Sequence, residues 1–343
     1  MTAVPVLGPA VSFDHLLRLT DDGGLFEHAE LTTPRPEHGY CVDDLARGLV
    51  VLAREPSPAA PLRRLGGDYL RLVVDAQAHD GRFHNRRSLE GRWTDAPTLD
   101  DCWGRALWGL GSVAARWGDE AQAGVALRHF ERGARHRSPH LRADVFAALG
   151  AAEVLTVRPG HRAARRLLTA TADRLLARPT EPGWPWPEPR LRYANGSLPE
   201  VLVAAGHLLG DARLLEAGLR MLTWLLDVET SGDQLSLTPV GGWARGEPRP
   251  GYDQQPIEVA ALADACARAL DVTGDPRWAV GLERCRRWFH GANDTGVMLL
   301  DVISGGGYDG LERHGRNENQ GAESTLALIS TLQRSAAVTA ART

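Results

Sequence analysis

Apolar residues recur every three or four positions along most of this chain, a spacing that places them on one face of a helix. One group of segments combines this pattern with many arginines, for example 61–78 ("PLRRLGGDYLRLVVDAQA") and 211–227 ("DARLLEAGLRMLTWLLD"). A helix that is polar on one face packs on the outside of a fold. Further segments of this outer kind lie at 120–137, 161–177 and 275–291.

A second group of segments is small and apolar on nearly every side, for example 143–155 ("ADVFAALGAAEVL") and 256–270 ("PIEVAALADACARAL"). Helices of this composition are buried, and their glycines and alanines let neighbouring helices approach closely. Segments of this inner kind also lie at 43–53, 100–115, 198–209 and 322–332.

Outer and inner segments alternate along the sequence. Together with a short segment at 12–20 they give about twelve helices, arranged as six outer–inner hairpins. No linker divides the chain, so the pattern predicts an all-α fold: one (α/α)6 toroid domain over residues 1–343. Each inner segment carries an acid at or near its N-terminal turn: Asp44, Asp101, Asp144, Glu200, Glu258 and Glu323.

The connections support this arrangement. Loops that lead from an outer to an inner segment are long and rich in Gly, Trp and Tyr, whereas return loops such as "TGDPRW" are short. All long loops therefore lie on one face, and we expect the functional residues on that rim. Short hairpins are expected at 24–31 and 296–303, without a substantial sheet.

Composition narrows the function. A net charge of −4 with 43% hydrophobic residues indicates a soluble globular protein and excludes a typical nucleic-acid binder, which carries a strongly basic surface. We expect no signal peptide and no membrane span. Four widely spaced cysteines without a CxxC pair favour reduced thiols, so we expect a bacterial, cytoplasmic protein with no membrane partner.

The predicted rim gathers the side chains that bind and cleave sugars. Aromatic faces stack on sugar C–H groups, polar groups bind hydroxyls, and cleavage of a glycosidic bond needs two flanking carboxyl groups. We expect four catalytic carboxylates: Asp43, Asp44, Asp101 and Glu258. We expect the substrate to contact His38, Tyr40, Trp103, Arg105, Trp184, Trp186, Tyr252, Asp253, Gln254, Gln255, Asp309, Asn319, Gln320 and Glu323.

The same acids also have a structural interpretation, because acids in a first helical turn cap N–H groups and complement the helix dipole. Ser197-Leu-Pro-Glu200 matches a capping box, which favours a structural Glu200, and Thr98-Leu-Asp-Asp101 fits a similar pattern. We also interpret Asp144 as structural.

Cys41, Cys102 and His38 form a conceivable zinc site, but small buried thiols that pack inner helices together are the favoured reading. We therefore expect no metal and no cofactor.

Seven motifs together resemble a bacterial family of glycosidase-like (α/α)6 proteins, some of which are fused behind a glycosyltransferase: "HGYCVDDLAR", "DGRFHNRRS", "DDCWGRALWGLG", "YDQQPIEVAALADAC", "WFHGAN", "GGYDGL" and "NQGAES". The resemblance spans about residues 14–332 and implies a six-hairpin toroid, an oligosaccharide or glycoside substrate and a glycosyltransferase partner. The resemblance implies that the functional positions of the family correspond in this sequence to Asp43, Asp44, Asp101, 253–258 and 319–323. Leu45 and Ala194 depart from it, since the family has an amide and an acid there.

The leading hypothesis is a glycoside hydrolase with Glu258 as acid and Asp101 as base, since the second and fifth inner helices of a six-membered ring face each other. The mouth of a toroid is wide, which favours an inverting over a retaining mechanism, because inversion needs room for a water molecule between the two carboxyl groups. One alternative is a sugar epimerase, which typically uses paired histidines, and another is a phosphorylase with phosphate held by Arg47, Arg105 and Arg316. A third is a non-catalytic glycan-binding partner of a glycosyltransferase.

Overall fold

The computed structural model describes residues 11–178, 180–181 and 183–340. Within these residues twelve α-helices alternate between an outer and an inner ring, as the sequence predicts. The outer helices are α1 (Asp14–Arg18), α3 (Ala60–Asp75), α5 (Glu120–Gly133), α7 (Arg162–Leu176), α9 (Ala212–Val228) and α11 (Pro276–Phe289). The inner helices are α2 (Val42–Arg54), α4 (Asp101–Arg116), α6 (Leu141–Val157), α8 (Ser197–Leu209), α10 (Pro256–Thr273) and α12 (Ala322–Ala340).

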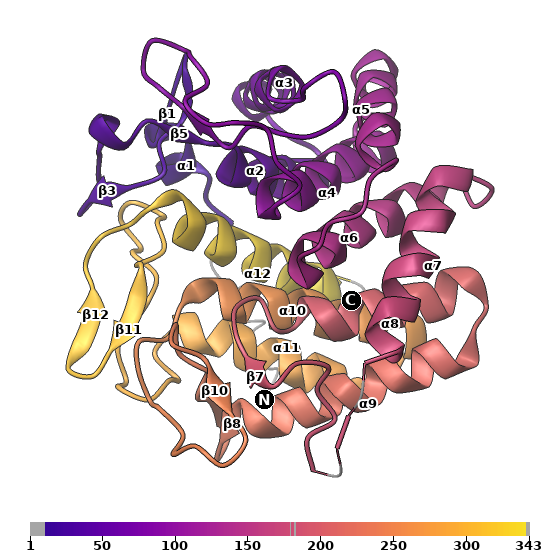
Figure 1. Ribbon diagram of the computed structural model, residues 1–343. Helices are drawn as coiled ribbons and strands as arrows, with labels where there is room; N and C mark the ends of the chain where they lie inside the picture. Colours follow the sequence, from indigo (N-terminus) through magenta and orange to yellow (C-terminus); the bar gives the residue numbers. More distant parts are fainter. Residues whose placement is uncertain (1–10, 179, 182, 341–343) are drawn as a thin grey trace.

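The inner helices form a closed ring. Each packs against the next along the chain, and α12 returns to pack against α2. Figure 1 shows these six helices around the middle of the molecule, with α3, α5, α7 and α9 outside them. The predicted (α/α)6 toroid is therefore confirmed. The first outer helix is the exception to the regular pattern, because α1 has only five residues.

Glycines allow neighbouring inner helices to touch along their backbones. A Cβ atom at Gly104 of α4 would lie 2.2 Å from the carbonyl oxygen of Ala143, and one at Gly150 of α6 would lie 2.2 Å from that of Leu107. Neither position admits a side chain. The small residues of the inner segments are thus explained by the close packing of α4 on α6.

An ion-pair network, which we call the floor, crosses the ring away from the mouth. Its members are Arg54, Arg116, Glu153, Glu200, Asp264, Arg268 and Arg334, so every inner helix contributes. Arg54 and Arg116 are the last residues of α2 and α4. Glu200 belongs to the first turn of α8 and reaches the floor through Arg268 at 3.0 Å, so α8 begins deeper in the ring than α2 and α4.

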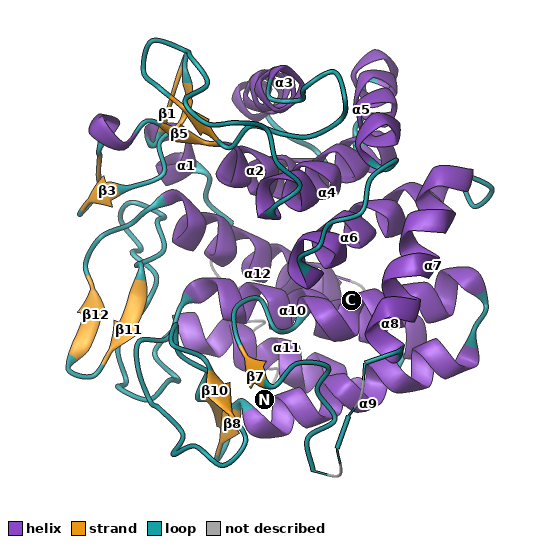
Figure 2. Ribbon diagram, in the orientation of Figure 1, coloured by secondary structure: helices purple, strands orange, loops and turns teal. Residues whose placement is uncertain are grey.

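Short strands occur in the long loops that lead from outer to inner helices (Figure 2). They pair as β1 (Thr20–Asp21) with β2 (Gly24–Leu25), β3 (Ala29–Glu30) with β4 (Thr33–Pro34), β5 (Tyr40–Cys41) with β6 (Arg86–Arg87), β7 (Arg190–Leu191) with β10 (Trp243–Ala244), β8 (Thr230–Ser231) with β9 (Gln234–Leu235), and β11 (Gly310–Glu312) with β12 (Gly315–Asn317).

A 3₁₀ helix, η1, spans Pro36–His38. The expected hairpin at 296–303 does not form, because Leu300 only makes an isolated bridge to Gly307 and the strands of that loop are β11 and β12. None of the helices in the described part of the chain has the length and apolar character needed to cross a membrane.

Candidate active site

A narrow cavity runs along the axis of the ring and offers about 40 Å³ to water-sized molecules, room for about three waters. One helical turn before its first lining residues on α2, α4 and α12 come Asp43, Asp101 and Glu323, which therefore face the same axis at the mouth. The lining residues are Arg47, Val50, Val51, Arg105, Trp108, Phe146, Ala194, Ser197, Ile257, Ala260, Ala261, Asp264, Leu326, Ala327 and Ser330.

The mouth carboxylates do not serve as helix caps. The outer helices α5, α9 and α11 are preceded by the N-cap residues Asp119, Asp211 and Asp275, whose side chains accept N–H bonds of the first turn. The inner helices α2, α4, α6, α8 and α10 have no side-chain cap. The predicted capping box at Ser197–Glu200 is therefore absent, because α8 starts at Ser197 and Glu200 pairs with Arg268.

Asp43 lies between Asn85 and Arg105. Asn85 donates from Nδ2 to Oδ2 of Asp43 at 2.9 Å, whereas Oδ1 of Asp43 lies 3.7 Å from Nε of Arg105 and has no hydrogen bond within the described chain. Arg105 is only 3% exposed and packs 4.0 Å from the ring centre of Phe146. Burial lowers the pKa of Arg105, and the charges of both Asp43 and Asp101 oppose that shift. One buried guanidinium thus interacts with both mouth aspartates.

Asp44 is turned away from the axis and is 1% exposed. Arg47 bridges it to Glu323 of α12, bonding to Oδ1 of Asp44 and, at 2.5 Å, to Oε2 of Glu323. Burial raises the pKa of Asp44 to about 7, while Arg47 opposes this shift. Asp44 therefore retains a proton in part of the molecules at neutral pH.

Asp101 accepts a hydrogen bond from the hydroxyl of Tyr193 at 2.6 Å. Burial, with the charge of Asp101, raises the pKa of Tyr193, which keeps this phenol a donor. Arg142 packs over the Tyr193 ring at 5.0 Å and donates to its carbonyl oxygen at 2.5 Å. These residues border a rim pocket of about 550 Å³, which is large enough for a sugar residue.

Glu258 points away from the axis, although its neighbour Ile257 lines the axial cavity. Its carboxylate accepts bonds from the backbone N–H of Ala194 and, at 3.1 and 3.0 Å, from the backbone and side-chain N–H groups of Asn195. Burial raises the pKa of Glu258 to about 8, with Glu229 adding to the shift and the Asn195 and Ala194 bonds opposing it. Both oxygens thus hold the 194–195 turn, and the expected opposition of Asp101 and Glu258 across the mouth is corrected.

Four aromatic residues expected to contact substrate are instead part of the core. Trp103 is 0% exposed and donates to a backbone carbonyl, and Tyr40 is 3% exposed and donates to Asp21. Trp184 and Trp186 are 6% and 1% exposed, and both pack against Trp224. The predicted binding platform at Trp184 and Trp186 and the predicted substrate contacts of Tyr40 and Trp103 are therefore corrected.

The polar residues expected from the later motifs mainly fix loops. Gln254 and Gln320 are 0% and 2% exposed and bond to neighbouring loop side chains. Asn319 accepts a backbone bond from the loop at residue 31, and Asp309 accepts one at 2.7 Å from residue 321. The prediction that Gln254 and Gln320 contact substrate is therefore corrected, because both are buried and bonded within the loops. Asp309 and Asn319 are half-buried, and their contact with substrate stays a prediction.

His38, Tyr252, Asp253 and Gln255 lie in the loops that enter α2 and α10. His38 is exposed and meets the ring of His28 edge-on, and Tyr252 packs under Arg313 at 5.6 Å. Nothing within the described residues connects these four to Asp43 or Asp101. Their role in substrate binding stays a prediction.

Sequence reasoning missed Arg142 and Tyr193. Tyr193 is 39% exposed, lies in the loop just before α8 and bonds to a mouth carboxylate, which makes it the aromatic side chain best placed for a sugar. Arg142 lies one turn before the cavity-lining Phe146 of α6, the position that Asp43 and Asp101 occupy on their own helices. That shared helical position is the signal that would have found it.

One group of metal-ligating types occurs in the described part of the chain: atoms of Glu27, Cys41 and Asp44 lie within 4.8 Å of one another. Their partners do not suit a cation, because Arg86 pairs with Glu27 and Arg47 with Asp44. Burial and neighbouring carboxylates raise the pKa of the Cys41 thiol, which keeps it protonated. The alternative set of Cys41, Cys102 and His38 is not assembled, since His38 packs against His28.

No family model and no curated protein sequence matches the chain. Solved structures do resemble it. A sugar epimerase from a ruminal bacterium aligns with a TM-score of 0.71 and 13% identity over 94% of this chain and 95% of the epimerase. A cellobiose 2-epimerase from Bacillus thermoamylovorans aligns with a TM-score of 0.70 and 9% identity over 93% and 95% of the two chains.

A third similar structure is an inactive variant of the α-1,6-mannanase GH76A of Salegentibacter sp. HEL1_6, in complex with α-1,6-mannotriose. Two consecutive aspartates of that enzyme are replaced by asparagine. It aligns with a TM-score of 0.63 and 9% identity over 94% of this chain and 95% of the mannanase. At these identities the comparisons establish the fold: the chain is an (α/α)6 toroid of the kind seen in these carbohydrate-processing enzymes.

Proposed function

We propose that the protein is a glycoside hydrolase whose reaction takes place at the mouth of the toroid, between Asp101 and the consecutive pair Asp43 and Asp44. One observation carries this proposal. Asp43 and Asp101 occupy the axis-facing first turn of two adjacent inner helices, neither caps its helix, and both act on the buried guanidinium of Arg105. The similar mannanase, which is inactive without two consecutive aspartates, supports the pair.

Asp101 takes the role of base in this proposal, because it borders the pocket with room for a sugar and for water. The oxygen of a water molecule attacks the anomeric carbon while Asp101 takes the water's proton. The glycosidic C–O bond breaks, and the leaving oxygen takes a proton from Asp43, which faces the axis and is recharged by the proton of the buried Asp44. Asp44 holds that proton near neutral pH, since burial raises its pKa to about 7.

The spacing of the helices favours inversion. Adjacent packed helices lie roughly 8–10 Å apart. We therefore expect the carboxyl groups of Asp43 and Asp101, on the same turn of two such helices, to leave the roughly 6.5–9.5 Å that an intervening water needs. Glu258 is assigned a positioning role, because it holds the turn that presents Tyr193 to Asp101.

Epimerisation is the second candidate, favoured by the two similar epimerases and by His140, which borders the rim pocket and lies 3.3 Å from Asp100. Paired histidines are the usual acid and base of such chemistry. His140 is the only histidine among the described residues that border this pocket or the axial cavity. Two carboxylates on the axis therefore favour hydrolysis.

We place the reaction in the bacterial cytoplasm, with a glycosyltransferase as the partner that makes or hands over the glycan. The four free, buried cysteines support a reducing compartment. A pull-down from a bacterial lysate under reducing conditions tests the partner, and fractionation tests the compartment.

The decisive experiment incubates the protein with α-1,6-mannotriose, with cellobiose and with a wider glycan panel, each with and without phosphate. Nuclear magnetic resonance of the products identifies hydrolysis, the anomer released, phosphorolysis or epimerisation. We expect Asp101→Asn to abolish hydrolysis while the melting temperature stays unchanged, since the side chain is partly exposed and caps no helix. Full turnover by this variant would refute the assignment.

A further inference from the structure

Arg105 is a buried cation without a hydrogen bond. It is 3% exposed and lines the axial cavity, yet its guanidinium makes no hydrogen bond to any other described residue. Its closest carboxylate is Asp43, whose Oδ1 lies 3.7 Å from Nε, beyond hydrogen-bond distance. A buried charged group in this state is costly unless a partner completes its bonding.

The other arginines inside the ring differ from Arg105. In the floor, Arg268 donates to Glu200 and Glu153 at 3.0 Å, and Arg334 donates to Asp264 at 2.6 Å. Arg142, near the mouth, donates to Asn195 at 3.0 Å. Arg47 and Arg334 also keep one buried nitrogen without a partner, but each donates to at least one carboxylate, whereas Arg105 makes no hydrogen bond within the described residues.

The atom that faces Arg105 is unsatisfied too. Oδ1 of Asp43 is shielded from solvent and accepts no hydrogen bond within the described residues, whereas Oδ2 is held by Asn85. A free donor and a free acceptor thus lie side by side at the top of the axial cavity. A hydroxyl group satisfies both, because its oxygen accepts a bond while its hydrogen donates one.

We propose that Arg105 and Asp43 form a donor–acceptor pair that binds one hydroxyl or hydroxymethyl group of a neutral sugar at the top of the axial cavity. The proposal rests on the proposed function and names the substrate class for the same site. The cavity of about 40 Å³ has the size of such a substituent and excludes a whole sugar ring. The ring itself stays in the mouth, beside Asp101 and Tyr193.

The charges around the pair favour a neutral sugar over a uronate or a phosphosugar. Arg47, the second cation at this level, is already bound by Asp44 and Glu323. Arg105 itself feels the charges of Asp43, Asp101 and Glu323. An anionic substituent would meet more carboxylates than free cations and would be repelled. Below the pair, the wall of the cavity is mostly apolar, with Phe146, Ile257 and Leu326, which suits the C–H groups of a sugar substituent.

Binding to the Asp101→Asn protein tests the proposal without turnover. The neutral probes are the methyl α-glycosides of mannose, glucose and galactose, and the anionic probes are glucuronic acid and inorganic phosphate, all titrated calorimetrically up to their solubility. We expect at least one neutral glycoside to bind. Adding Arg105→Met should weaken it about 10- to 100-fold, the loss of one or two charge-assisted hydrogen bonds. Arg105→Lys should recover part of the affinity, because it keeps the charge and one donor.

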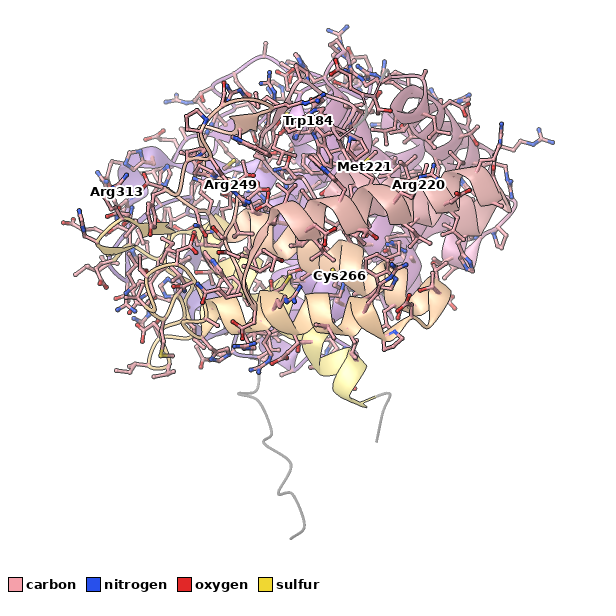
Figure 3. The ribbon with its side chains drawn as sticks, turned by 90° about the horizontal axis from the view of Figure 1, so that it is seen from below. Trp184, Arg220, Met221, Arg249, Cys266 and Arg313 are labelled. Atoms are coloured by element: carbon pink, nitrogen blue, oxygen red, sulfur yellow. The ribbon has the colours of Figure 1, made fainter. Side chains whose placement is uncertain are left out.

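The matched control is Arg220→Met, which removes an exposed arginine from α9 (Figure 3) and should leave both affinity and melting temperature unchanged. Asp43→Asn is a second variant at the pair and should weaken the same glycoside. The proposal is overturned if no neutral glycoside binds, if Arg105→Met binds as the parent does, or if phosphate or glucuronate binds in an Arg105-dependent way. If a neutral glycoside binds in an Arg105-dependent way but the protein hydrolyses no glycan, the proposed hydrolase function is refuted, whereas the proposed binding role of Arg105 and Asp43 stands.

Discussion

Arg268→Met should destabilise the toroid strongly, because it leaves a buried carboxylate without a cation. Nε of Arg268 donates to Glu200, and a terminal nitrogen donates to Glu153, both at 3.0 Å. Glu153 keeps a second partner, Arg116, at 2.7 Å. Glu200 has no second hydrogen-bonding cation in the described chain; its side chain is 1% exposed, and its other oxygen is unpaired.

The expected loss follows from this difference. Removing one partner of a buried ion pair costs about 3–5 kcal/mol, and we take the lower end, about 3 kcal/mol, because Glu153 stays paired. An unfolding entropy of about 2.1 cal/mol/K per residue gives about 0.7 kcal/mol/K for the 343 residues, so the melting temperature falls by roughly 4 °C. Burial raises the pKa of Glu200 and Arg268 lowers it, so loss of Arg268 raises it further. Burial costs less for the protonated form of Glu200 than for the charged form. The loss of stability caused by Arg268→Met therefore becomes smaller as the pH falls and larger as the pH rises.

Unfolding in guanidinium chloride measures the free energy of unfolding of Arg268→Met, of Glu200→Gln and of the double variant. Glu200→Gln should restore part of the stability lost in Arg268→Met, because it removes the stranded charge. Arg213→Met is the control: its pair with Asp211 is exposed on the arginine side, and its loss should change stability by about 1 kcal/mol or less. An Arg268→Met protein as stable as the parent, or a double variant without recovery, would refute the role assigned to the floor.

Two further predictions concern the mouth. Tyr193→Phe should lower kcat/KM for the hydrolysed glycan about tenfold, the worth of one hydrogen bond to a carboxylate, with an unchanged melting temperature; full activity would remove Tyr193 from the site. Because burial raises the pKa of Asp44 to about 7, its contribution to stability is present below its ordinary value near 3.8 and lost as the pH rises to about 7. Asp44→Asn should abolish this slope in melting temperature between about pH 4 and 7, and an unchanged slope would contradict the shift.

The toroid was predictable because it follows from two local patterns. The segment at 256–270 becomes α10, which starts at the expected Pro256, and the segment at 143–155 becomes α6 with two more residues at each end. Pro256 fits the first helical position, where its missing N–H costs nothing. Alternation of amphipathic and wholly apolar helices then admits few arrangements other than a double ring.

The residues of the candidate active site were harder to predict. An inner helix is apolar on every side, so its sequence does not show which of its faces points to the axis of the ring. Position alone places Asp43 and Asp44, or Ile257 and Glu258, at the mouth. Only the packed ring decides that Asp43 and Ile257 face the axis while Glu258 turns towards the 194–195 turn. An amphipathic helix would have disclosed its orientation through its polar face.

The prediction that the loop tryptophans bind substrate was wrong for another reason. "GWPWPEP" is polar and proline-rich, so it predicts an exposed binding loop. In the structure Trp184 lies 5.2 Å from Trp224 of α9 and 5.3 Å from Trp243 of a later loop. These partners are distant in sequence, and no local pattern predicts that they form a small core under the loops.

The distribution of charge in the toroid follows its helix dipoles, and this explains how the mouth holds several carboxylates. The N-termini of α2, α4 and α12 carry partial positive charge beside Asp43, Asp101 and Glu323, while Arg54 and Arg116 lie at the negative C-termini of α2 and α4. Dipoles of this orientation stabilise the ionised form of an acid at the mouth. A carboxyl group that must keep its proton for catalysis therefore needs another source of stabilisation for its neutral form. Burial away from the axis supplies it for Asp44, which therefore holds a proton one residue after the axis-facing Asp43.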